Sequence, residues 1–141
     1  EQSKDNPVFY VQYANARVNS VLRKAREAGI DVDDATLARA DLLGLTHEAE
    51  IAVAKKLAEW PRLVELAGRM NEPHRVAFYL YDLASELHTL WNRGNDDPAL
   101  RFLQEDDPAT SQSKIALARA VTVVISAGLG ILGVTPAKEM R

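Results

Sequence analysis

The strongest constraint on the fold is one long helical series of apolar residues in the middle of the chain. After Pro73, apolar side chains recur every three or four positions, at Val76, Leu80, Leu83, Leu87 and Leu90. That spacing is typical of the buried face of an α-helix. We expect a long helix that begins at Pro73 and closes at Gly94.

The segment after Asn6-Pro7 is predicted to be a second long helix, with an asparagine cap, a proline in its first turn and a stop at Gly29. The Asp5 side chain is a further candidate for this cap. The core-facing residues recur at helical spacing: Val11, Ala14, Val18, Leu22 and Ala25. Residues 30–44 are acidic and predicted to be a loop with a short helical turn around 37–43.

The remaining helices follow from caps and prolines. Thr46 is the expected cap of a helix that Trp60-Pro61 ends, with an apolar series through Ile51, Ala54, Leu57 and Ala58. A further helical segment then covers residues 61–67. Ser111 or Ser113 is expected to open a last helix that ends near Gly128, with Leu117, Val121 and Val124 facing inward, followed by an apolar tail that folds back. Residues 92–110 hold two Asp-Asp-Pro breaks and are expected to form a mobile surface loop.

No segment shows a convincing strand pattern, so the predicted fold is all-α, an antiparallel bundle of five or six helices that forms one domain over residues 1–141. The chain has no cysteine, which excludes disulfides and thiolate chemistry. The apolar stretch 116–134 is interrupted by polar residues and glycines, so we interpret it as a core helix instead of a membrane span.

The three histidines give no metal-binding spacing. No second histidine follows His47 four residues later, and we expect His74 and His88 to be ordinary surface or helix-end residues. The sequence also lacks a glycine-rich phosphate loop and a nucleophile elbow. We therefore expect neither a catalytic residue nor a metal site in this chain.

A second stripe on the first helix is the candidate functional surface. Its residues lie about 100° around the helix from the core stripe: Tyr10, Tyr13, Arg17, Ser20 and Lys24. Aromatic rings and arginine beside one another suit unpaired RNA bases, and Trp91 could join them. The net charge of −3 is unusual for a nucleic-acid binder, but the basic residues of this helix form a local patch. The alternative is that the aromatic residues only pack the bundle.

Four segments resemble arginyl-tRNA synthetases, in order and over nearly the whole chain. They are Asn-Pro-Val-Phe-Tyr-Val-Gln-Tyr-Ala-Asn-Ala-Arg at 6–17, Glu-Pro-His-Arg-Val-Ala-Phe-Tyr-Leu-Tyr-Asp-Leu-Ala at 72–84, Leu-Ala-Arg-Ala-Val at 117–121 with Gly-Leu-Gly-Ile-Leu-Gly-Val at 128–134, and Pro-Ala-Lys-Glu-Met-Arg at 136–141. The resemblance is to the C-terminal, DALR-type anticodon-binding domain of this class I family.

The resemblance implies that the anticodon loop of tRNA-Arg lies against Tyr10, Tyr13, Arg17, Trp91 and Met140. Two departures stand out: Asn15 replaces the family's usual histidine, and Arg141 follows the methionine, where it could add a phosphate contact. The resemblance also implies a cytoplasmic enzyme that uses ATP and Mg²⁺ in a catalytic domain of the same polypeptide. That domain and the N-terminal tRNA-binding domain are absent here, so we expect a fragment without a catalytic site, and with no DNA or membrane partner.

Two alternatives remain at this point. The related helical domain of the glycyl-tRNA synthetase β subunit has the same fold and a different tRNA. A helical protein-interaction module without an RNA role would instead show an exposed apolar groove and partner binding that is insensitive to salt.

Overall fold

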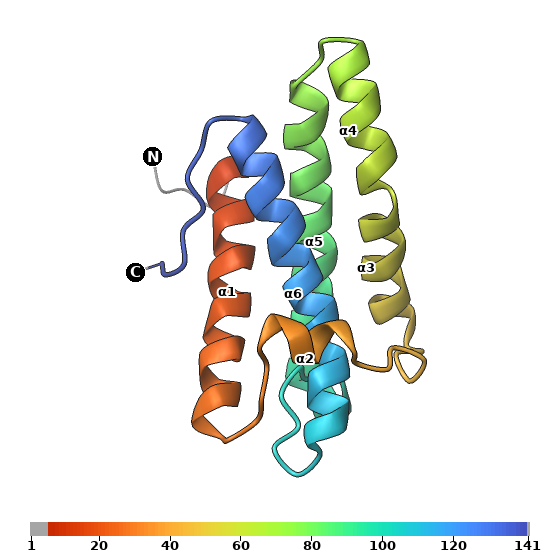
Figure 1. Ribbon diagram of the computed structural model, residues 1–141, viewed down its shortest axis with the longest axis vertical. Coiled ribbons are helices and arrows are strands. Elements are labelled where there is room, and N and C mark those ends of the chain that lie inside the picture. The colour runs from red at the N-terminus through yellow and green to blue at the C-terminus, as the bar shows by residue number, and fades with distance from the viewer. Residues whose placement is uncertain (1–5, 141) are drawn as a thin grey trace.

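The computed structural model describes residues 6–140, and over this part of the chain it is helical without strands. The all-α prediction is confirmed. The helices, drawn in Figure 1, are α1 (Pro7–Glu27), α2 (Asp34–Ala38), α3 (Glu48–Ala58), α4 (Trp60–Arg69), α5 (His74–Asp96) and α6 (Pro108–Ile131), with a short 3-10 helix, η1 (Pro98–Leu100), between the last two.

Helix α5 is the centre of the bundle. It packs against α1, α3, α4, α6 and η1, whereas α2 packs against α6 (Figure 1). All five residues of its predicted apolar series are at most 1% exposed, and the five predicted core residues of α1 are buried as well. Both predictions are confirmed, because apolar residues at this spacing share one face of a helix and that face must be covered.

The two ends of α1 follow the local sequence. The Asn6 side chain accepts a hydrogen bond from the Val8 amide at 2.9 Å, and Pro7 is the first helical residue. At the other end Gly29 adopts a φ of +81°, a conformation that residues with a Cβ rarely adopt. The chain can therefore turn sharply toward α2, which lies at 34–38 and so slightly before the expected turn. Asp5 lies outside the described residues.

Helix α3 differs from the prediction in its cap and in its buried face. His47, not Thr46, caps the helix: its Nδ1 accepts from the Ala49 amide at 3.0 Å, and the Glu50 carboxylate accepts from the His47 amide. Ile51 is 39% exposed, whereas Glu50 is only 4% exposed. The reason is an ion pair: Glu50 lies 2.8 Å from the Lys114 ammonium of α6, and pairing lets both charges be buried.

The prediction of a mobile loop over residues 92–110 is wrong. Helix α5 continues past Gly94 to Asp96, and η1 follows directly. Leu100 and Phe102 are buried, so this connection belongs to the core. Helix α6 begins at Pro108, before both serines that were expected to open it, because Asp107 caps it. It also continues past Gly128 to Ile131.

The C-terminal tail turns at Gly133, where φ is +76°, and runs back beside α1 (Figure 1). Side chains of α1 hold it there. Gln12 Nε2 donates to the Thr135 carbonyl at 3.1 Å, its Oε1 accepts from the Ala137 amide, and Asn15 Nδ2 donates to the Ala137 carbonyl at 2.8 Å. Asn15 is buried, and its Oδ1 has no hydrogen-bond partner within the described part of the chain.

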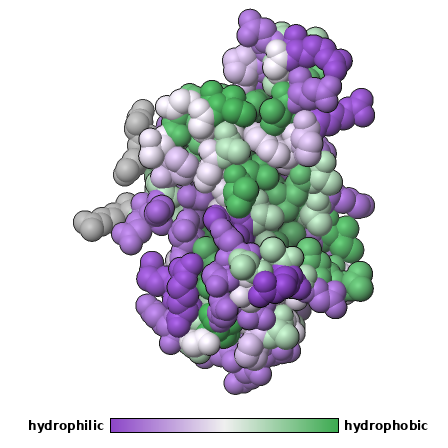
Figure 2. Space-filling model, viewed as in Figure 1, coloured by the Kyte–Doolittle hydropathy of each residue, from purple (hydrophilic) through white to green (hydrophobic). Residues whose placement is uncertain are grey.

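One face of the molecule shows apolar atoms gathered over α6 and α3, with polar atoms around the α4–α5 turn (Figure 2). Helix α6 is long and apolar enough to cross a bilayer by length and composition alone. Half of its most apolar window is buried inside the bundle, including Leu117, Val121 and Ile125. The helix thus supplies much of the core, as the sequence predicts.

Candidate nucleic-acid interface

The aromatic and basic stripe of α1 faces a matching stripe on α5. Tyr81, His88 and Trp91 follow one another by seven and three residues, so they share one side of α5. This side meets Tyr10 and Tyr13 of α1, because the two helices pack against each other. The interface between α1 and α5 therefore gathers aromatic rings at one edge of the apolar core.

Arg17 lies at the centre of this cluster. Its guanidinium carbon is 4.5 Å from the centroid of the Tyr13 ring and 4.9 Å from that of Trp91. Its Nη1 lies 2.9 Å from Nδ1 of His88. A guanidinium can only donate, so His88 Nδ1 must accept, and the proton of the neutral imidazole belongs on Nε2. Nε2 faces the Tyr10 carbonyl oxygen at 3.5 Å.

His88 is the residue that the sequence interpretation misjudged. It is 5% exposed, not a surface residue. Burial, and then the charge of Arg17, lower its pKa from 6.5 to about 4, against a smaller opposite effect of the Tyr10 carbonyl. His88 is therefore neutral at physiological pH and available as an acceptor for Arg17. Examining α5 for a second stripe, as on α1, would have placed it beside Tyr81 and Trp91.

The tyrosines have different surroundings. The Tyr10 ring is half-buried, with its centroid 4.9 Å from that of Tyr81 and 4.6 Å from that of His88. The Tyr13 ring lies 5.3 Å from His88 and 6.4 Å from Phe9, and Tyr13 remains 36% exposed. Tyr13 thus offers accessible aromatic surface, while Tyr10 mainly supports the cluster from inside.

A groove of about 450 Å³ lies along the exposed side of the cluster, between α1 and the C-terminal tail. Tyr13, Arg17 and Met140 all line it, together with the cations Arg23 and Lys138 and the single carboxylate of Glu139. Met140 reaches this place because Gln12 and Asn15 hold the tail against α1. Arg141 lies outside the described residues.

The structure therefore brings all five predicted site residues into one region. Tyr13, Arg17 and Met140 share the groove, Trp91 contacts the Arg17 guanidinium, and Tyr10 joins them through His88. An exposed ring, a fixed guanidinium and cationic neighbours can stack on unpaired bases, donate hydrogen bonds to them and attract phosphate. Within residues 6–140, no group of three His, Asp or Glu side chains is placed to hold a metal ion.

A helical bundle with such a surface is suited to single-stranded parts of RNA. Residues 11–140 match the DALR anticodon binding domain, and the chain belongs to this family. It is 79% identical over 141 residues to an arginine--tRNA ligase of Cereibacter sphaeroides and 74% identical to one of Paracoccus denitrificans. It spans 24% of the length of each of these relatives.

The fold agrees with the same family. The Thermus thermophilus arginyl-tRNA synthetase superposes with a TM-score of 0.80 at 29% sequence identity. The match covers 98% of this chain and 22% of that synthetase. The helical arrangement of this chain is therefore shared with one part of a much longer protein.

Proposed function

We propose that this chain is the part of an arginine–tRNA ligase that binds the anticodon loop of tRNA-Arg. The observation that carries the proposal is the arrangement of Arg17 between Tyr13 and Trp91, beside the groove that Met140 helps to line. The family and the names of the relatives support the same conclusion. Attachment of arginine, which needs ATP and Mg²⁺, would take place in a catalytic domain of the same cytoplasmic polypeptide.

In this mechanism, loop bases leave their stack and lie on the platform of Tyr13 and Trp91, which Tyr10 supports from inside, and Arg17 contacts the middle base of the anticodon. Every arginine anticodon has C at this position. The Watson–Crick edge of cytosine carries two adjacent acceptors, O2 and N3, and a guanidinium offers a planar set of donors. Guanine would present donors on N1 and N2 instead, which face the Arg17 donors unfavourably.

His88 is a positioning residue in this mechanism. Its neutral ring accepts one hydrogen bond from Arg17 and leaves other guanidinium N–H groups for a base. The contacts with Tyr13 and Trp91 restrict the plane of the guanidinium further. Less rotamer freedom is then lost when the base binds, which favours affinity.

The test is a titration of this chain with tRNA-Arg and with a transcript in which the middle anticodon base is changed from C to G, followed by tryptophan fluorescence at low salt. We expect the native tRNA to bind more tightly. Tyr13→Ala should weaken binding about tenfold, within the range for one stacked base. Phe78→Ala removes an aromatic residue that is 68% exposed and does not line the groove, and it serves as the matched control.

Other outcomes separate the alternatives. Unchanged affinity after combined alanine substitution of Tyr10, Tyr13 and Arg17 would refute the mechanism, and equal binding of both transcripts would indicate a non-specific backbone clamp. Competition by tRNA-Gly would favour the glycyl-type domain. Affinity for tRNA should fall as salt rises, whereas a protein-interaction module would not show this dependence.

A further inference from the structure

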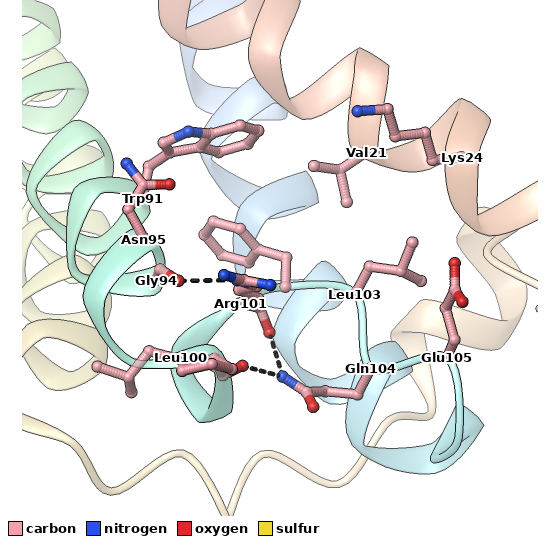
Figure 3. Close-up of a pocket in the computed structure, with 12 residues that line it drawn as sticks. Val21, Lys24, Trp91, Gly94, Asn95, Leu100, Arg101, Leu103, Gln104 and Glu105 are labelled. Atoms are coloured by element: carbon pink, nitrogen blue, oxygen red, sulfur yellow. Dashed lines mark hydrogen bonds between the residues drawn. The ribbon is translucent and has the colours of Figure 1, made fainter.

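A second cavity lies beside the platform, at the end of α5 (Figure 3). Its volume is about 450 Å³, within the general range of ligand sites. Three elements enclose it: α1 with Val21 and Lys24, the last turns of α5 with Trp91, and the connection to α6 with Phe102, Leu103 and Glu105. Apart from Trp91, the residues of the proposed anticodon site do not line it.

The connection that forms one wall is held in place by its own hydrogen bonds. Arg101 Nε donates to the Gly94 carbonyl at 2.8 Å, and Gln104 Nε2 donates to the carbonyls of Pro98 and Arg101 (Figure 3). The Ser111 hydroxyl bonds both the amide and the carbonyl of Gln104, at 2.7 Å each. The cavity is therefore formed before any ligand enters, which lowers the ordering cost of binding.

The lining chemistry suits a flat, partly polar ligand that carries a negatively charged group. Trp91 and Phe102 supply aromatic surface, with ring centroids 6.1 Å apart, and Leu103 adds an aliphatic side chain. Lys24 and Arg101 supply two cations, of which Arg101 is bonded through its Nε to the Gly94 carbonyl, and Glu105 supplies one carboxylate. A carboxylate only accepts hydrogen bonds, so it selects a ligand that has donors, such as an exocyclic amino group.

One side chain, Trp91, links the cavity to the platform. Trp91 lines the cavity, and its ring also contacts the Arg17 guanidinium at 4.9 Å. Lys24 belongs to the same helical stripe of α1 as Tyr13 and Arg17. A chain of nucleotides that follows this stripe from the groove would therefore reach the cavity next.

We propose that this cavity binds one further unpaired nucleobase of the same RNA, next to the base held at Arg17. The base lies against Trp91 and Leu103, its exocyclic amino group donates to Glu105, and its phosphate lies near Lys24. Cytosine, adenine and guanine carry this amino group, whereas uracil could donate to Glu105 only from its ring N3–H. The inference rests on the proposed function, because it needs an RNA loop on the platform.

The test compares a substitution that fills the cavity with a matched substitution elsewhere on the surface. Leu103→Trp places a large ring in the cavity, while Leu43→Trp makes the same exchange at a residue that is 87% exposed and lines neither cavity. We expect Leu103→Trp to weaken binding of a tRNA-Arg transcript about tenfold, as for one lost stacked base, and Leu43→Trp to leave it unchanged.

Transcripts with an abasic site at each loop position in turn identify the base. At one position other than the middle of the anticodon, the abasic change should weaken binding to the native chain but not to Leu103→Trp, because both changes remove the same contact. Circular dichroism checks that Leu103→Trp folds. If it does not, Glu105→Gln on the cavity rim is used instead, and it should weaken binding about tenfold by loss of a charged hydrogen bond.

Binding by the cavity variants within twofold of the native chain, while Tyr13→Ala still weakens it, would overturn this inference and leave the proposed function standing. The inference would also be overturned if the loss of affinity caused by Leu103→Trp and the loss caused by the abasic site were additive at every loop position. Absence of any tRNA-Arg binding by the native chain would overturn the proposed function and this inference together.

Discussion

The buried neutral state of His88 makes a quantitative prediction about the pH dependence of stability. The pKa of His88 is about 4 in the folded chain against 6.5 as its ordinary value. The unfolded chain therefore binds more protons than the folded chain between these two values, and stability must rise with pH in this window. The stabilisation is complete above the unfolded pKa and is lost as the pH falls toward the folded pKa.

The size of the effect follows from the two pKa values. Each pKa unit corresponds to roughly 1.4 kcal/mol, and integration from about pH 7.5 to about pH 5 gives a loss of about 2 kcal/mol from His88 alone. Carboxylates also titrate in this pH range. A variant that lacks only the His88 ring has the same carboxylates as the native chain, so their contribution cancels when the two chains are compared. We therefore expect the free energy of unfolding of His88→Phe to fall by about 2 kcal/mol less than that of the native chain over the same pH range.

The assay is urea denaturation of both chains at the two pH values. With the denaturant dependence usual for small domains, the differential effect is about 1 M in the transition midpoint. His74→Phe makes the same exchange at a side chain that is 59% exposed and controls for the introduced ring. Equal acid-induced losses in the native chain and in His88→Phe would refute the argument that His88 is buried uncharged against Arg17.

Two further predictions concern stability and use the same denaturation measurement. A Cβ on Gly128 would lie 2.7 Å from both terminal carbons of Leu80, so Gly128→Ala should destabilise the fold by about 1 kcal/mol or more, whereas Gly130→Ala, with no atom within 4 Å, should not. Lys114→Met should cost about 3–5 kcal/mol of stability because it leaves the buried Glu50 carboxylate without its partner. Adding Glu50→Gln to this variant should restore much of the loss. Equal stability of the single and double variants would contradict this account.

The sequence by itself determined most of the local structure. The apolar series of α1 and α5 predicted which faces are buried, since a repeat of three to four residues specifies one face of a helix whatever packs against it. The same repeat placed Tyr10, Tyr13 and Arg17 on one stripe. Where a charge is buried, this logic fails: Glu50 looks like a surface residue until Lys114, which is 64 positions away, is known to pair with it.

Only the tertiary structure decided how residues of different helices combine. His88 and Trp91 reach Arg17 because α5 packs against α1, and Met140 reaches the groove because Gln12 and Asn15 bind the tail. The connection after α5 looks like a loop in the sequence, yet hydrogen bonds to Gly94 and Ser111 turn it into the wall of a cavity. The physical reason is that helical periodicity encodes the direction of a side chain within its own helix, whereas its partners depend on which faces meet in the folded chain.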